Sequence, residues 1–219
     1  MANAVVQLYF SQLTANKVTL FDYKTQEFTD FPALTPLVAP LGMRTDKHDN
    51  LWYTDFVGQF ISKIDSLTGK VTEYKDCCPL PEGAFPEVLR ASTSNQKYLW
   101  ANAFGFQGYI RIEPDEPDDS KKFKIFTNPT LTDIGSAPFE NDNDFCGRVW
   151  YSSPDQNVLI YYDPELDEWT TVTVPGLPVT GNFEVTMHRG PGHYMWFSIG
   201  TLGKIGRYEL DANCVGQPQ

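Results

Sequence analysis

Short stretches in which apolar and polar residues alternate follow one another along most of the chain. The clearest are rich in Val, Ile, Thr and aromatic residues and occupy positions 18–22, 61–65, 109–113, 158–163 and 205–209. A period of two residues is typical of strands with one buried face. No stretch keeps the 3.6-residue period of an amphipathic helix. The pattern therefore predicts an all-β chain.

A second pattern repeats at a longer interval. An apolar residue, an aromatic residue and, two positions later, a small polar residue recur around Tyr9, Trp52, Trp100, Trp150 and Trp196, at spacings of 43 to 50 residues. This period suits four short strands and their turns, the size of one propeller blade. We interpret the four tryptophans, one per repeat, as core between neighbouring blades.

The repeats define the expected architecture. The first four continue with a turn and a last strand, at 27–31, 71–74, 123–126 and 169–172. We predict an all-β, small β-propeller of five blades with three to four antiparallel strands each, in one domain covering 1–219. Its repeat units are, approximately, 5–42, 43–83, 84–135, 136–181 and 182–219.

The two end repeats look incomplete, because the first begins at its second strand and the last stops after its third. Thin end blades, a ring completed by the tails and part of a larger ring are all compatible with this pattern. We expect a closed ring, because an open one exposes sheet edges.

Charge limits the partners. The 17 Lys and Arg residues against 28 Asp and Glu residues give a net charge of −11. Such a surface repels phosphates, so we expect neither nucleic acid nor an anionic membrane as a partner. The first residues lack the basic and apolar regions of a signal peptide, which predicts a cytoplasmic protein. We expect a monomer or a small homo-oligomer with a small-molecule substrate.

The four cysteines are Cys77, Cys78, Cys146 and Cys214. They are too few and too irregularly spaced for a disulfide scaffold, and the adjacent pair lacks the spacing of a zinc site. We interpret them as small buried thiols. A disulfide would require an oxidising compartment.

The repeat sequence resembles a known family. Asn50-Leu51-Trp52-Tyr53-Thr54-Asp55, Ile61-Ser62-Lys63-Ile64-Asp65 and the segment from Thr68 to Tyr74 are similar to the blade signature of the virginiamycin B lyase (streptogramin lyase) family, and so are 195–198 and 203–207. The resemblance implies a propeller that opens a lactone ring by elimination, without water. It also implies a histidine and glutamates acting with Mg²⁺, an inventory that Glu87, Glu140, Glu184 and His188 resemble.

Three glutamates occupy equivalent places in consecutive repeats. Glu87, Glu140 and Glu184 each follow a connection to an innermost strand, so we expect them to meet at the mouth of the central channel. Grouped carboxylates raise their pKa values or bind a cation, Mg²⁺ or Ca²⁺ for oxygen ligands. We therefore predict catalytic and metal-ligating roles for all three. They would otherwise be solvated loop charges.

His188 is the best candidate base among the three histidines. It lies four residues after Glu184, an even offset that keeps both side chains on one face of a regular strand. Imidazole suits proton transfer near neutral pH. His48 and His193 lie in turns, where we expect exposed side chains.

A second set of residues is expected around the same mouth. Its members are predicted to bind substrate through apolar walls, amide groups or a guanidinium clamp: Asp55, Phe56, Gln59, Phe104, Phe106, Gln156, Asn157, Arg44 and Arg90. Alternatively, the phenylalanines pack beneath their own loops and the arginines neutralise the glutamates. No nucleotide-binding or serine-nucleophile motif is present, so we expect neither nucleotide nor flavin.

Two functions remain open from the sequence. One is a lyase-like enzyme that acts on a small cyclic or lactone-type metabolite by acid–base elimination, ring opening or cyclisation. The other is a non-catalytic propeller that binds a glycan, a peptide or a protein. A dependence of stability on Mg²⁺ or Ca²⁺ would favour the first.

Overall fold

The structure, a computed structural model, describes residues 7–92, 96–129, 140–153, 156–176 and 186–211. For residues 87, 88, 90–92 and 201 it describes the backbone alone. Within these ranges the chain forms 18 β-strands and a short 3₁₀ helix, η2 (Gly200–Leu202). The all-β class predicted from the alternating pattern is confirmed.

The strands form five antiparallel sheets, numbered here from the N-terminus. Sheet 1 comprises β1 (Gln7–Gln12), β2 (Lys17–Asp22) and β3 (Glu27–Pro32). Sheet 2 comprises β4 (Pro40–Thr45), β5 (Leu51–Asp55), β6 (Phe60–Ile64) and β7 (Val71–Tyr74). Sheet 3 comprises β8 (Phe85–Ser92), β9 (Leu99–Phe104), β10 (Phe106–Ile112) and β11 (Phe123–Thr127). Sheet 4 comprises β12 (Asn141–Asn143), β13 (Val149–Ser153), β14 (Val158–Asp163) and β15 (Glu168–Thr173). Sheet 5 comprises β16 (Met187–Arg189), β17 (Tyr194–Ile199) and β18 (Lys204–Glu209).

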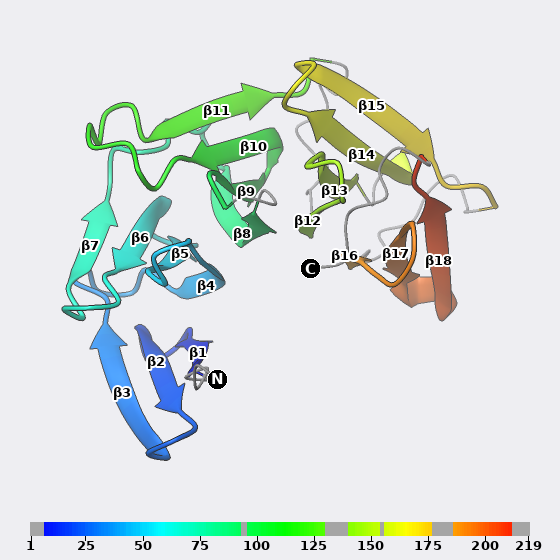
Figure 1. Cartoon of the computed structure of the whole chain (residues 1–219). Helices are drawn as coiled ribbons and strands as arrows, with labels where there is room; N and C mark the ends of the chain where they lie inside the picture. The colour runs from blue at the N-terminus through cyan, green and yellow to red at the C-terminus, as the bar shows by residue number, and fades with distance from the viewer. Residues whose placement is uncertain (1–6, 93–95, 130–139, 154–155, 177–185, 212–219) are drawn as a thin grey trace.

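The sheets stand side by side in an arc around a common centre (Figure 1). In each sheet the strands follow chain order from the inside outward, so β4, β8, β12 and β16 line the centre. Successive inner strands contact one another, from β1 and β4 to β12 and β16. This arrangement of three- and four-stranded sheets is propeller-like, and it brings residues from separate repeats to one place.

The apolar core lies between the sheets. Trp100 and Tyr109 of sheet 3 pack against Val149 and Tyr151 of sheet 4, and all four are completely buried. Equivalent clusters join each of the other neighbouring pairs. The interpretation of the tryptophans is confirmed for Trp52, Trp100 and Trp150, which are at most 1% exposed. Trp196, in the last sheet, is only partly buried.

The arc does not show the closed ring that we expected. Figure 1 shows sheets 1 and 5 at its two ends, separated by a gap. Within the described ranges, the extensive contacts between strands of different sheets join neighbouring sheets, and none joins sheet 1 to sheet 5. Closure therefore stays a prediction, and so do the limits of the repeat units.

The cysteines differ from the sequence interpretation. Cys77 and Cys78 form a disulfide with each other, and Cys146 is also disulfide-bonded. The interpretation as free thiols is therefore wrong for these three residues. The spacing of consecutive cysteines is unsuited to a zinc site but compatible with a direct disulfide. Separately, no helix in the described ranges is long and apolar enough to cross a bilayer.

Candidate functional site

A histidine and a carboxylate from neighbouring sheets meet at the centre of the arc. His188 lies on β16 and Asp142 on β12, and the histidine Nδ1 is 3.7 Å from Asp142 Oδ2. The His188 side chain is 54% exposed, whereas that of Asp142 is 20% exposed. The pair therefore joins an accessible imidazole to a sheltered carboxylate.

Backbone hydrogen bonds hold the carboxylate in place. The amide of Arg189 donates to Asp142 Oδ2 at 2.9 Å, and the amide of Asn143 donates to Oδ1 at 2.8 Å. The first bond crosses from β16 to β12, so it also fixes the spacing of the two inner strands. A carboxylate near Nδ1 favours the tautomer with its proton on Nδ1, which leaves the Nε2 lone pair available as a base.

Polar groups continue along the inner strands toward sheet 3. Asn141, beside Asp142, donates from Nδ2 to Asn102 Oδ1 at 2.6 Å, and both asparagines are completely buried. Glu140 comes directly before β12 and is only 6% exposed. Of the three glutamates, it is the one whose side chain the structure describes. Its burial differs from the solvated loop charge that was the alternative.

The other catalytic and metal predictions are not tested. Glu184 lies outside the described residues, and Glu87 and Arg90 lie on β8 with only their backbones described. No group of three or more His, Cys, Asp or Glu side chains within the described ranges is arranged to hold a metal ion. The described residues therefore do not assemble a cation site, and we derive no chemical step through a metal.

Asp55, predicted to bind substrate, is the last residue of β5 and is completely buried. The hydroxyl of Ser62 donates a hydrogen bond to Asp55 Oδ2. Burial, the largest cause, raises the pKa of Asp55 to about 7, with the Ser62 hydrogen bond lowering it and the charge of Glu73 contributing to the rise. Because its side chain has no exposed surface, Asp55 is not positioned for direct contact with a ligand in this structure.

Two predicted amide residues have a clear role in their turns. Gln59 and Asn157 each stand directly before the third strand of their repeats, with φ of 60° and 58°. Asn16 and Gly203 hold the same place in sheets 1 and 5, with φ of 54° and 59°. This left-handed conformation favours Gly and Asn. The repeated geometry explains both residues as hairpin positions, and their role in binding stays a prediction.

The remaining predicted binding residues vary in exposure. Phe106 is 6% exposed in a small core cluster with Ala84 and Ala103, which matches the alternative that it packs beneath its own loop. Phe104 is 45% exposed, and Phe56 is half-buried with its ring 5.4 Å from that of Phe85. Arg44 is exposed at the end of β4, and Gln156 is half-buried.

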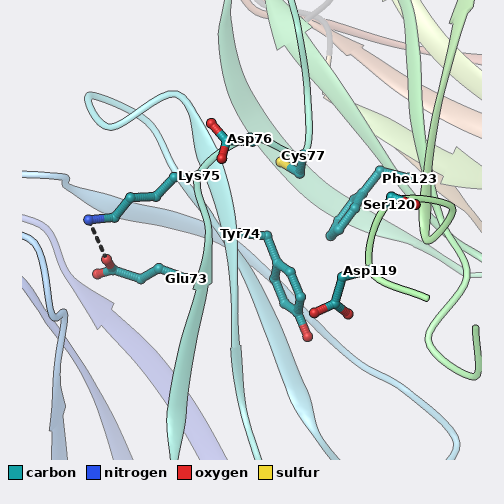
Figure 2. A pocket seen from close by; sticks show the side chains of 8 residues that line it. All are labelled: Glu73, Tyr74, Lys75, Asp76, Cys77, Asp119, Ser120 and Phe123. Atoms are coloured by element: carbon teal, nitrogen blue, oxygen red, sulfur yellow. Dashed lines mark ion pairs between the residues drawn. The ribbon is translucent and has the colours of Figure 1, made fainter. Parts of the chain in front are cut away.

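A pocket of about 430 Å³ lies away from the centre, between the outer parts of sheets 2 and 3 (Figure 2). Its apolar wall consists of Tyr74, Phe123 and Cys77, with the two rings 5.1 Å apart. Asp76 and Asp119 stand at its edge, and Asp119 is near the hydroxyl end of Tyr74 in Figure 2. Sequence reasoning missed this pocket, because it forms where the last strands of two repeats, β7 and β11, meet the connections beside them.

Asp142 was also missed by sequence reasoning. The segment Glu140-Asn141-Asp142-Asn143-Asp144 contains three acids, and equivalence among repeats pointed to the first. The structure brings the third residue of this segment, Asp142, to His188. Alternation along β12 was a usable signal, because Glu140 and Asp142 share one face of an extended strand.

Comparison with solved structures gives strong matches. A catalytically inactive variant of virginiamycin B lyase from Staphylococcus aureus, with quinupristin, has a TM-score of 0.77 and 23% identity, covering 98% of this chain and 66% of that one. A streptogramin B lyase has a TM-score of 0.74 and 21% identity, covering 97% and 68%. The dihydro-heme d1 dehydrogenase NirN, in complex with DHE, has a TM-score of 0.66 and 12% identity, covering 97% and 43%.

No protein-family model and no curated protein matches the sequence. The likeness is therefore one of structure, over nearly all of this chain and about two thirds of the length of the lyases. It agrees with the resemblance in the repeats around Trp52 and Trp196. The chain has a virginiamycin B lyase-like fold.

Proposed function

We propose that this protein is a lyase that opens a small cyclic ester by acid–base elimination at the centre of the arc. The observation that carries the proposal is the pairing of exposed His188 with sheltered Asp142 on adjoining inner strands. The likeness to virginiamycin B and streptogramin B lyases supports the reaction class.

The proposed step needs one base. His188 Nε2 removes a proton from the carbon next to a carbonyl group, and the electron pair of that C–H bond forms a C=C bond as the neighbouring C–O bond breaks. The ester oxygen leaves as a carboxylate. Asp142 stabilises the imidazolium that forms, and it acts as a positioning residue. Product and substrate have the same mass, because no water enters.

Quinupristin, present in one of the similar structures, is the first substrate to test. Mass spectrometry separates elimination, which leaves the mass unchanged, from hydrolysis, which adds one water. We expect His188→Ala to lower turnover by about 10²–10⁴-fold. Asp142→Asn should give a smaller loss and a changed pH profile, because it alters the environment of the base. No turnover by the parent protein, or full turnover by His188→Ala, would contradict the proposal.

His193→Ala is the matched control. His193 lies in the connection directly before β17 (Tyr194–Ile199). Its main-chain oxygen accepts a hydrogen bond from the amide of Leu210, and the substitution leaves that bond intact. We expect unchanged turnover. Equal melting temperatures for both histidine variants would show that a loss in His188→Ala is chemical and not due to unfolding.

Binding without chemistry is the second candidate function. Glu140, which was predicted to be catalytic, is buried in the structure, which leaves fewer groups for proton transfer at an open site. The likeness to NirN, a dehydrogenase, means that a similar fold occurs with a different activity, so the fold alone does not assign lyase chemistry. Quinupristin that binds by calorimetry but returns chemically unchanged after long incubation would favour this function.

A further inference from the structure

The pocket between the outer parts of sheets 2 and 3 is separate from the site at the centre. We call it the outer pocket; it is lined by residues 73–77, Asp119, Ser120 and Phe123. These residues belong to β7, β11 and the connections beside them, whereas the proposed base lies on the inner strand β16. The volume of about 430 Å³ falls within the usual range of small-molecule sites. Its size therefore suits a small ligand.

The aromatic wall of the outer pocket is held in place by the core. The ring of Tyr74 lies 5.5 Å from the buried ring of Trp52, at an angle of 13° between the two planes. The ring of Phe123 lies 5.1 Å from that of Tyr74, at an angle of 58°. Both half-buried rings pack against the core cluster that contains Trp52 and Leu89. The two rings thus form a corner that exists before any ligand arrives.

The disulfide adds a third apolar surface to this corner. Cys77 lines the pocket and is bonded to Cys78, which is 8% exposed and belongs to the same core cluster. Figure 2 shows Cys77 beside the ring of Phe123. Cysteine sulfur is polarisable and packs like a small apolar group. The disulfide therefore attaches this part of the wall to the core.

Two of the charged residues that line the pocket neutralise each other. Glu73 Oε2 lies 3.4 Å from Lys75 Nζ, and the side chain of Glu73 is only 3% exposed. The amide and the hydroxyl of Thr35 also donate to the Glu73 carboxylate, each at 2.7 Å. Figure 2 shows the Glu73–Lys75 pair turned away from the rings of Tyr74 and Phe123. This ion pair is therefore part of the framework of the pocket and adds no net charge to it.

The two remaining acids make the edge of the pocket negative. Asp76 is exposed, and the side chain of Asp119 is 69% exposed. Lys122 Nζ lies 3.9 Å from Asp119, beyond hydrogen-bond distance, and donates instead to the main-chain oxygens of Pro114 and Glu116. Lys122 thus neutralises Asp119 only weakly.

The charge of Asp119 also acts on the aromatic wall. Burial, the largest cause, raises the pKa of Tyr74 to about 12, and the charge of Asp119 contributes to the rise. Figure 2 shows Asp119 near the hydroxyl end of Tyr74. The faces of aromatic rings carry negative potential of their own. The rings and the acidic edge therefore favour the same kind of ligand, a cation.

We propose that the outer pocket binds a small quaternary ammonium ion. The charged group lies against the rings of Tyr74 and Phe123, and its methyl groups contact the rings and Cys77. Asp76 and Asp119 supply the opposite charge from the edge. A primary ammonium ion would lose more of its hydration against these apolar surfaces, so the quaternary ion fits them better. This inference does not rest on the proposed lyase activity.

Choline is the probe, titrated into the full chain by isothermal calorimetry. Its control is dimethylbutanol, which has the same shape with an uncharged carbon in place of the nitrogen. We expect saturable binding of choline and an affinity for dimethylbutanol at least about 10-fold weaker, because the neutral molecule gains nothing from the rings' potential or the carboxylates. Phosphocholine should also bind more weakly than choline, because its phosphate meets Asp76 and Asp119.

Two variants locate the binding site. Asp119→Asn removes a charge at an exposed position, and Phe123→Leu removes a ring but keeps an apolar side chain. We expect each to weaken choline binding by about 3- to 10-fold. Glu165→Gln is the matched control, because it removes the same charge from an exposed turn of sheet 4 and should leave the affinity unchanged. Melting temperatures show whether each variant is folded, and Asp119→Asn tests the site without altering the core.

Three results would overturn the proposal. The first is the absence of saturable choline binding up to about 20 mM. The second is equal affinity for choline and dimethylbutanol, which would mean that the pocket takes apolar molecules without regard to charge. The third is full affinity for choline in both Asp119→Asn and Phe123→Leu, which would mean that choline binds elsewhere on the chain.

Discussion

The carboxylate of Asp144 accepts a hydrogen bond from the indole Nε1 of Trp150, six residues further along, at 2.8 Å. Asp46 and Trp52 repeat this bond at the same distance in sheet 2. Each aspartate lies in the turn between the first two strands of its sheet and is only 2% exposed. The pair ties that turn to the core between two sheets.

We expect Asp144→Ala to lower the free energy of unfolding by about 2–4 kcal/mol. Besides Trp150, Asp144 accepts bonds from the amides of Cys146 and Arg148 at 2.9 and 3.0 Å and from Arg148 Nε at 2.5 Å. Its loss leaves buried donors without an acceptor. Urea denaturation measures the effect.

Asp163→Ala is the control for this loss. Asp163 also accepts two turn amides, from Glu165 at 2.9 Å and from Leu166 at 3.2 Å, but in an exposed turn. Water replaces those bonds, so we expect a loss of about 1 kcal/mol or less. Equal effects of Asp144→Ala and Asp163→Ala would contradict the role of burial.

The sequence predicted the strands well, because alternation and turn residues act locally. The strands Val71–Tyr74 and Val158–Asp163 have the predicted bounds. The aspartate–tryptophan bond was not predicted, since the other two tryptophan repeats carry Ser94 and Gly190 six residues earlier. In the described part of the chain, the Nε1 groups of Trp100 and Trp196 have no hydrogen-bond partner.

The residues of the candidate site at the centre of the arc were harder to predict than the strands. Repeat equivalence brought His188 to the inner strand, where the structure has it, but its partner Asp142 depends on how β12 and β16 lie side by side. That relation is set by packing between sheets, which one repeat does not encode. The disulfide lies in a connection between sheets, and so do several residues that line the outer pocket. These connections differ from repeat to repeat, so the repeated pattern does not predict them.

Gly190→Ala should disturb the last sheet. A Cβ atom at this position would lie 2.1 Å from Cδ1 of Trp196, a rigid ring that cannot yield as a flexible chain does. We expect a loss of about 1–3 kcal/mol and a shift in tryptophan fluorescence as Trp196 moves. Unchanged fluorescence and stability would show that the ring does not rest on Gly190.

The disulfide between Cys77 and Cys78 gives a chemical prediction. Cys78 is 8% exposed and packs with Trp52 and Leu89, whereas Cys77 lines the outer pocket. We expect both to resist alkylation in the native protein and to react after reduction by a thiol reagent. Mass spectrometry of the peptide that contains both residues detects the difference. Alkylation of either cysteine without reduction would contradict the pairing.

Serine should be tolerated differently at the two cysteine positions, because Cys77 lines the outer pocket and Cys78 packs in the core. A disulfide between adjacent residues closes a minimal loop, so it restricts the unfolded chain very little. Removing it should therefore lower the free energy of unfolding only slightly through this effect. A serine hydroxyl at position 78 would, however, lie in an apolar cluster. We therefore expect Cys78→Ala to be better tolerated than Cys78→Ser when each is combined with Cys77→Ser, as measured by thermal melting.

Asp55 predicts how stability depends on pH. Burial raises its pKa from 3.8 to about 7 in the folded protein, whereas the unfolded chain keeps the ordinary value. Between these values the folded state holds a proton that the unfolded state has lost. Stability from this group is therefore fully present below about pH 4 and is lost as the pH rises toward 7.

Asp55→Asn removes this titration while keeping the size of the side chain. We expect the variant to be more stable than the parent at pH 8, by an amount on the order of 2–4 kcal/mol, and to approach or fall below it at pH 4.5. Urea denaturation at a series of pH values measures the difference. Asp163→Asn, the same substitution at an exposed turn, is the matched control. A constant difference between Asp55→Asn and the parent from pH 4.5 to 8 would show that Asp55 does not titrate there, and that the buried carboxyl is held in one protonation state throughout.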